Sequence, residues 1–68
     1  MEFSKKYNRA VSVAQTIMEG KSARDAAEEH GIHRNTVTKD IDYLMKYAKA
    51  KRHQDLAMAA NAELKKRS

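Results

Sequence analysis

A single glycine, Gly31, most constrains the fold of this chain, because it lies between two stretches that both have helical spacing. The stretch before it, Ala23 to His30, is short, and the stretch after it keeps apolar residues at intervals of three and four. A glycine at such a junction can take the left-handed backbone conformation that ends a helix, without a Cβ penalty. The sequence therefore predicts two helices joined by a sharp turn.

Small and apolar side chains around this turn predict how the two helices pack. Ala27, four residues before the glycine, is small enough to let the helices cross closely. The side chains expected to point back at the first helix and form an apolar wedge are Ile32, Val37, Ile41 and Leu44. This pattern is typical of a helix-turn-helix, in which a short helix supports a recognition helix against duplex DNA.

The opposite edge of the second helix carries side chains of the kinds that hydrogen-bond base edges and phosphates. We expect base contacts from His33, Arg34, Asn35, Thr38 and Lys39. Arg34 has the geometry to bind a guanine through two hydrogen bonds, and Asn35 can bind an adenine or a phosphate. Double-stranded DNA is therefore the expected partner.

The segment G-I-H-R-N-T-V-T-K-D-I, preceded by A-R-D-A-A-E-E-H, resembles the helix-turn-helix of the stage III sporulation DNA-binding regulators, over roughly Ile17 to Leu44. The resemblance implies a phosphate contact for Arg24. It also implies that the major groove is faced by Arg34, Asn35, Thr36, Thr38 and Lys39.

Two histidines depart from the pattern of that family. His33 stands where the family has a Ser or Thr helix cap, and His30 stands where it has a large apolar residue. We therefore expect a weakened cap on the recognition helix and an underfilled wedge beneath it.

The charge of the chain is concentrated near its end. Of the net charge of +5, residues 48–68 carry +4. Such a balance suits a polyanionic partner, although lysine and arginine also keep small proteins soluble. Phosphate contacts are expected from Ser22, Arg24, Lys46, Lys49, Lys51 and Arg52.

Before the turn, the pattern predicts a helix from the cap Ser4 to about Glu19, ended by Gly20, and then a short helix capped by Ser22. The buried face expected for the first helix comprises Tyr7, Ala10, Val11, Ala14, Ile17 and Met18. Its Arg9 is expected to face water or DNA. For the second helix we expect an interior face of Ala26, Ala27 and His30.

After the turn, the recognition helix is expected to run from Arg34 to about Tyr47 or Ala48. Asp40 is an unusual residue on a helix that enters DNA. We expect it to hold a nearby cation, with Lys39, Arg34 and Arg24 as the candidate partners.

The tail beyond Ala48 allows two geometries. Either the helix ends within residues 49–54 and a new one runs from the cap Asp55 to about Lys66, or one long helix continues. Three uses of the tail also remain open. It can complete the core of its own domain, form a homodimer through Leu56, Ala60 and Leu64, or place Lys49, Lys51 and Arg52 on a phosphate backbone or in a minor groove.

The length and composition of the chain limit the fold classes that it can adopt. Sixty-eight residues allow one domain, which buries only about 60% of its unfolded surface. The absence of cysteine excludes disulfides and thiolate zinc sites. We predict an all-α fold, a small three- to four-helix bundle containing a helix-turn-helix. Residues 1–48 would form the DNA-binding domain and residues 49–68 a basic C-terminal helix or extension.

Other chemistry has little support in the sequence. His30 and His33 lack enough further ligands for a metal site, and two glycines cannot build a glycine-rich phosphate loop. We expect no enzyme activity, no cofactor, no metal and no small-molecule ligand. There is no membrane-spanning apolar run and no apolar signal core after the N-terminus, so a cytoplasmic protein is expected.

Together these features predict sequence-specific binding of double-stranded DNA by a small bacterial, phage or plasmid transcriptional regulator. Two alternatives stay open. One is a DNA architectural, recombination or packaging recognition factor. The other is a protein-interaction module that uses the amphipathic C-terminal helix.

Overall fold

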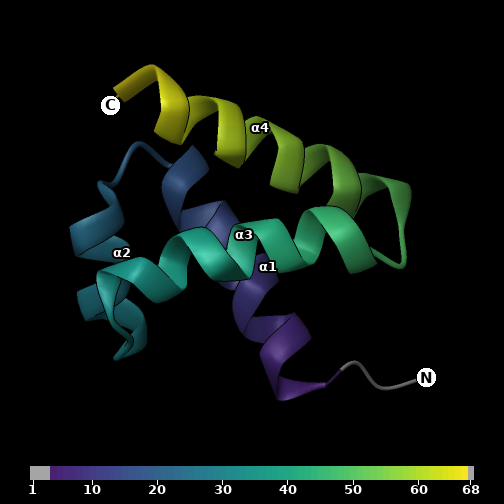
Figure 1. The fold of residues 1–68 in the computed structure, drawn as a ribbon, viewed down its shortest axis with the longest axis horizontal. Helices are drawn as coiled ribbons and strands as arrows, with labels where there is room; N and C mark the ends of the chain where they lie inside the picture. Colours follow the sequence, from purple (N-terminus) through teal and green to yellow (C-terminus); the bar gives the residue numbers. More distant parts are fainter. Residues whose placement is uncertain (1–3, 68) are drawn as a thin grey trace.

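The computed structural model describes residues 4–67, which form four helices and no strand within that range (Figure 1). The helices are α1 (Lys5–Met18), α2 (Ala23–His30), α3 (Arg34–Tyr47) and α4 (Lys51–Arg67). α3 crosses α1, and α4 packs against both and runs beside α3 in the opposite direction. The predicted small all-α bundle is confirmed. No helix of this part of the chain has the length and apolar character needed to cross a bilayer.

The first two helices begin at the serines expected from the sequence. The Ser4 hydroxyl accepts a hydrogen bond from the Tyr7 N–H at 3.1 Å. The Ser22 hydroxyl accepts one from the Asp25 N–H at 3.0 Å. Each bond satisfies one of the backbone donors that a helix leaves unpaired at its N-terminus, which fixes where the helix begins.

Glycines in left-handed conformations end the same two helices. Gly20 has φ +99°, and Gly31 has φ +65°. Around Gly31 the Ile32 N–H donates to the Ala27 carbonyl at 2.9 Å, and the Gly31 N–H donates to the Glu28 carbonyl at 3.3 Å. This pair of bonds is a Schellman motif, which turns the chain sharply and brings α3 back against α2.

One core lies among the four helices and includes residues from each of them. Its buried apolar side chains are Tyr7, Ala10, Val13, Ala14, Ile17, Ala26, Ala27, Val37, Ile41, Leu44, Ala57 and Ala60. The prediction for α1 was wrong at Met18, which is 45% exposed, and it omitted Val13, which is fully buried. Three helices surround α1, so its buried face is wider than a single stripe.

The hydroxyl of Tyr7 connects α1 to the reversal between α3 and α4. It accepts a hydrogen bond from the Lys49 N–H at 2.8 Å and lies 2.8 Å from Nδ1 of His53. The Tyr7 hydroxyl can donate to Nδ1 of His53 when the ring hydrogen lies on Nε2, or accept from Nδ1–H in the other tautomer. Both Tyr7 and His53 are buried, so this pairing satisfies groups that water cannot reach.

The beginning of α4 differs from both predicted geometries. α3 ends at Tyr47, so no continuous helix forms, and α4 begins at Lys51 rather than after Asp55. The Ala50 carbonyl accepts from the N–H groups of His53 and Gln54, at 3.0 and 3.1 Å, and so starts the first turn of α4. The chain therefore reverses within three residues, 48–50, none of which is a glycine or a proline.

The last turn of α4 is connected to the end of α1. Arg67 donates to the Lys21 carbonyl at 2.6 Å and to the Ile17 carbonyl at 3.2 Å. Its guanidinium also lies 3.3 Å from the Glu63 carboxylate, one helical turn earlier. Arg67 thereby connects the end of α4 to the last turn of α1 and to the link that follows it.

Removing the Tyr7 hydroxyl should destabilise the fold. We expect Tyr7→Phe to lower the free energy of unfolding by about 1–3 kcal/mol, because it removes a hydrogen-bond partner from the partly buried Lys49 N–H and from the buried His53 Nδ1. The measurement is urea unfolding followed by circular dichroism. The matched control is Tyr47→Phe, since the Tyr47 side chain is 56% exposed. Equal effects of the two substitutions would contradict the assigned role of the Tyr7 hydroxyl.

Candidate nucleic-acid interface

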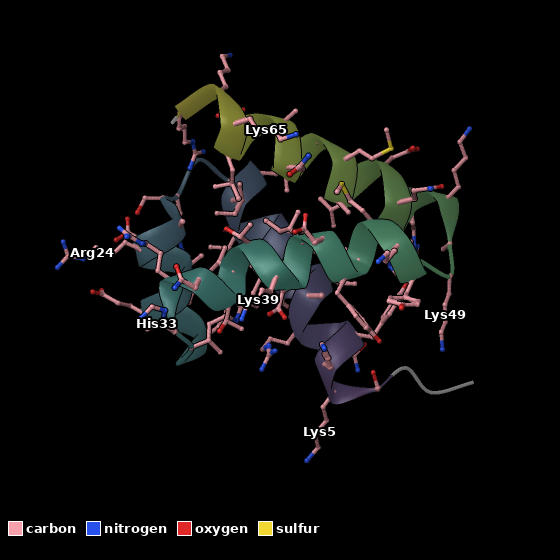
Figure 2. All side chains as sticks on the ribbon, viewed as in Figure 1. Lys5, Arg24, His33, Lys39, Lys49 and Lys65 are labelled. Atoms are coloured by element: carbon pink, nitrogen blue, oxygen red, sulfur yellow. The ribbon has the colours of Figure 1, made fainter. Side chains whose placement is uncertain are left out.

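The outer face of α3 carries a polar stripe formed by Asn35, Lys39, Asp42 and Lys46, all exposed. The opposite face buries Val37, Ile41 and Leu44 in the core. These spacings of three and four residues place the two sets on opposite sides of one helix. Figure 2 shows α3 along one side of the molecule, with Lys39 near its middle. We call these four residues the α3 stripe.

The structure brings together most of the residues for which base contacts were predicted. His33, Arg34, Asn35, Thr38 and Lys39 are all exposed and lie at the N-terminal half of α3 or directly before it. Thr36 is half-buried, on the side of α3 turned away from α4. Arg34 and Thr38 flank the α3 stripe on the side facing α4, where both line a cleft between the two helices.

His33 caps α3, contrary to the expectation of a weakened cap. Its Nδ1 accepts a hydrogen bond from the Asn35 N–H at 3.1 Å, while its backbone is extended as in other N-caps. The imidazole therefore replaces the hydroxyl or carboxylate oxygen that usually accepts this bond. Since Nδ1 is the acceptor, the ring hydrogen lies on Nε2, which can donate to a group outside the protein.

His30, which stands where the resembling family has a large apolar residue, has a polar partner on α1. Its Nε2 lies 3.1 Å from the Thr16 hydroxyl of α1, and that hydroxyl donates its own hydrogen to the Ser12 carbonyl at 2.9 Å. The hydroxyl must then accept from the Nε2–H of His30. A polar contact between α1 and α2 thus takes the place of apolar packing.

Asp40 pairs with Arg9 of α1, and not with Lys39, Arg34 or Arg24 as predicted. The two guanidinium–carboxylate hydrogen bonds are 2.8 and 2.9 Å long. Asp40 is 1% exposed, whereas the Arg9 side chain is 37% exposed. The hydrogen bond with Asp40 raises the pKa of Arg9 above its ordinary value, so this cation stays charged. The bidentate pair fixes α3 against α1 from behind the α3 stripe.

The residues predicted to contact phosphates lie at two separate ends of the molecule. Ser22 and Arg24 share a shallow groove with Arg34, beside the beginning of α3. Arg24 also lies 3.7 Å from the exposed carboxylate of Glu28.

At the other end, Lys49 lies in the α3–α4 reversal, and Lys51 and Arg52 begin α4, all three exposed. Figure 2 places Lys49 far from Arg24 and His33. Lys46, on the C-terminal half of α3, lies between the two groups.

Residues from two other helices border α3, and sequence reasoning missed those of α4. Asn61 and Lys65 of α4 line the cleft that also contains Arg34. On the other side, the Lys6 ammonium lies 4.6 Å from the centre of the Tyr43 ring. No local pattern indicates these neighbours, because they depend on how α1 and α4 cross α3.

The strip predicted to form a homodimer is largely used within the chain. Ala60 is fully buried in the core, and Leu56 and Leu64 are half-buried and pack against that core. A contact between two copies would therefore have only the edges of the two leucines available. The homodimer stays a prediction.

No three His, Cys, Asp or Glu side chains of residues 4–67 come together as a possible metal site. Comparisons of the chain with protein-family models, with curated proteins and with solved structures gave no match. The case for a function therefore depends on the chain's own residues.

Removing Arg9 and removing Asp40 should lower the free energy of unfolding by different amounts. We expect Arg9→Met to lower the free energy of unfolding by about 2 kcal/mol, because it leaves a buried carboxylate without its cation. This value is below the 3–5 kcal/mol typical of a fully buried pair, because the Arg9 side chain reaches water. Asp40→Asn should cost about 1 kcal/mol or less, since Arg9 can be rehydrated.

The measurement is chemical unfolding of Arg9→Met, Asp40→Asn and the double variant. The double variant should be more stable than Arg9→Met, because it contains no unpaired carboxylate. Purely additive effects of the two substitutions would show that the pair is not coupled.

Proposed function

We propose that α2 and α3 form a helix-turn-helix that binds double-stranded DNA with sequence preference, with α3 as the recognition helix in the major groove. The main support for this proposal comes from the polar side chains on the exposed side of α3, which are not used within the fold. Within the described residues, those of Arg34, Asn35, Thr38 and Lys39 form no hydrogen bond or ion pair. They are exposed and available to bind a partner.

The use of polar side chains elsewhere supports this proposal. Arg9 and Arg67, together with the histidines His30 and His53, all bind other parts of the chain. The N-terminal half of α3 instead presents two cations, an amide and a hydroxyl without such bonds. These are the groups that bind base edges and phosphates in a major groove.

The positions of the carboxylates restrict how DNA can approach. Asp40 is turned inward to Arg9, so it places no exposed charge beneath the recognition residues. Asp42 lies on the α3 stripe about 10 Å beyond Asn35 along the helix axis, past the part that usually meets bases. Glu28 and Glu29 are exposed on α2 and would repel phosphates there. We therefore place the N-terminal half of α3 in the major groove. The cellular role that we propose for this DNA binding is that of a small transcriptional regulator.

Binding to duplex DNA should depend steeply on salt. If the five predicted phosphate-binding cations all engage, the logarithm of the binding constant should fall against the logarithm of salt concentration with a slope of about −4 to −5. Fluorescence anisotropy with a labelled duplex measures this slope. Selection of bound sequences from a random duplex pool then tests for sequence preference. An absence of salt-dependent binding would refute the proposal, and it is the result expected for a protein-interaction module.

Arg34 and Lys51 should differ in their effects on DNA recognition. Arg34→Ala should cost about 1–3 kcal/mol on the selected sequence and reduce its preference over random DNA, because a guanine contact is lost. Lys51→Ala should weaken binding to all sequences alike, because a phosphate contact carries no sequence information. Titrations of both variants against selected and random duplexes make the comparison. Equal losses on both duplexes for Arg34→Ala would contradict base recognition by Arg34.

A further inference from the structure

A shallow cleft runs between the N-terminal half of α3 and the last turns of α4. Its polar lining comes from both helices: Arg34, Asn35 and Thr38 from α3, and Asn61 and Lys65 from α4. Ala23 and Leu64 complete the lining. α4 therefore contributes a second polar wall directly beside the residues proposed to read DNA.

The side chain of Asn61 belongs to this wall of the cleft. It is half-buried, and within residues 4–67 its amide forms no hydrogen bond. A side-chain amide has an NH2 group that can donate two hydrogen bonds and an oxygen that can accept them. A partner placed in the cleft could use these groups, and it would find the side chain already positioned by the packed backbone of α4.

The surroundings of the cleft favour an anion. A neighbouring groove, which shares Arg34 and Leu64 with the cleft, is also lined by Arg24 and Arg67. Together with Lys65, four cations border this end of the molecule; Arg24 lies 3.7 Å from Glu28 and Arg67 lies 3.3 Å from Glu63, whereas Arg34 forms no ion pair within residues 4–67. Neither groove has an Asp or Glu among its described lining residues. A phosphate group in the cleft would therefore meet cationic side chains and no carboxylate of the lining.

The position of α4 relative to α3 indicates which phosphate groups of the DNA would reach the cleft. A major groove is wide enough for one helix, and packed helices lie about 8–10 Å apart, axis to axis. If α3 occupies the groove, the adjacent wall of α4 meets the edge of the groove, which is the sugar–phosphate backbone.

We infer that Asn61 and Lys65 bind the phosphate backbone of the DNA strand that borders the groove occupied by α3. The inference rests on the proposed function and extends it to α4. The two side chains clamp one strand against Arg34 and so set the depth at which α3 enters. This contact lies at the opposite end of α4 from Lys51 and Arg52, for which phosphate contacts were predicted from the sequence.

Two pairs of variants with matched charge changes test the inference. Lys65→Gln is compared with Lys66→Gln, and Asn61→Asp with Ala62→Asp; the control residues are exposed and line neither groove. Binding to a labelled duplex of about 20 base pairs, two helical turns, is measured by anisotropy at several salt concentrations. Circular dichroism checks that each variant keeps its helices.

Lys65→Gln should weaken binding about five- to tenfold and reduce the size of the salt slope by about 1, while Lys66→Gln should change affinity less than about twofold. Asn61→Asp should weaken binding about tenfold or more, because it replaces a donor by a like charge, and Ala62→Asp about two- to threefold. The preference for selected over random DNA should stay unchanged in all four variants.

The outcomes separate this inference from the proposed function. If the wild-type protein does not bind duplex DNA, both are overturned. If it binds and each cleft variant behaves like its matched control, only the inference fails. If Asn61→Asp or Lys65→Gln reduces the preference for the selected sequence, the contact is to a base and the assignment to the backbone is wrong.

Discussion

The hydroxyl of one buried tyrosine connects α1 to the reversal that sends the last helix of this chain back along α3. Tyr7 binds the Lys49 N–H in the α3–α4 reversal and the imidazole of His53 in the first turn of α4. These bonds occur where the sequence contains no glycine or proline to break the helix. Because the chain reverses there, α4 runs back along α3, and its last turns lie beside the first turn of α3. The cleft that contains Arg34 and Asn61 therefore depends on a contact made at the far end of the bundle.

Polar side chains fall into two groups according to whether the fold uses them. One group connects helices: Arg9 with Asp40, His30 with Thr16, and Arg67 with carbonyls at the end of α1. These bonds satisfy groups that packing removes from water, so they contribute to stability. Other polar side chains are exposed and connect no helices, and on α3 these include Arg34, Asn35, Thr38 and Lys39, which form no hydrogen bond or ion pair within residues 4–67. The DNA contacts that we propose involve this second group of side chains, which can bind a partner without breaking any bond between helices.

Local features of this fold could be predicted from the sequence, and long-range features could not. Serine N-caps and C-terminal glycines act within a few residues, so the bounds of α1, α2 and α3 could be predicted from the local sequence. The partner of Asp40 lies 31 residues away in Arg9, and no local rule identifies it. Asn61 was missed for the same reason, because only the reversal before α4 brings it to α3. The cap at His33 was misjudged because imidazole is an uncommon acceptor there, although its Nδ1 has the geometry to accept.

The high alanine content of the core affects the heat-capacity increment of unfolding. Six of the twelve apolar residues buried in the described chain are alanines: Ala10, Ala14, Ala26, Ala27, Ala57 and Ala60. Such small side chains let helices approach closely, but each exposes little apolar surface to water when the chain unfolds. The heat-capacity increment of unfolding follows that exposed apolar surface, so it is small for a domain of this length. We therefore expect a shallow stability curve and a broad, low calorimetric transition whose midpoint moves by several degrees for each kcal/mol of stability gained or lost.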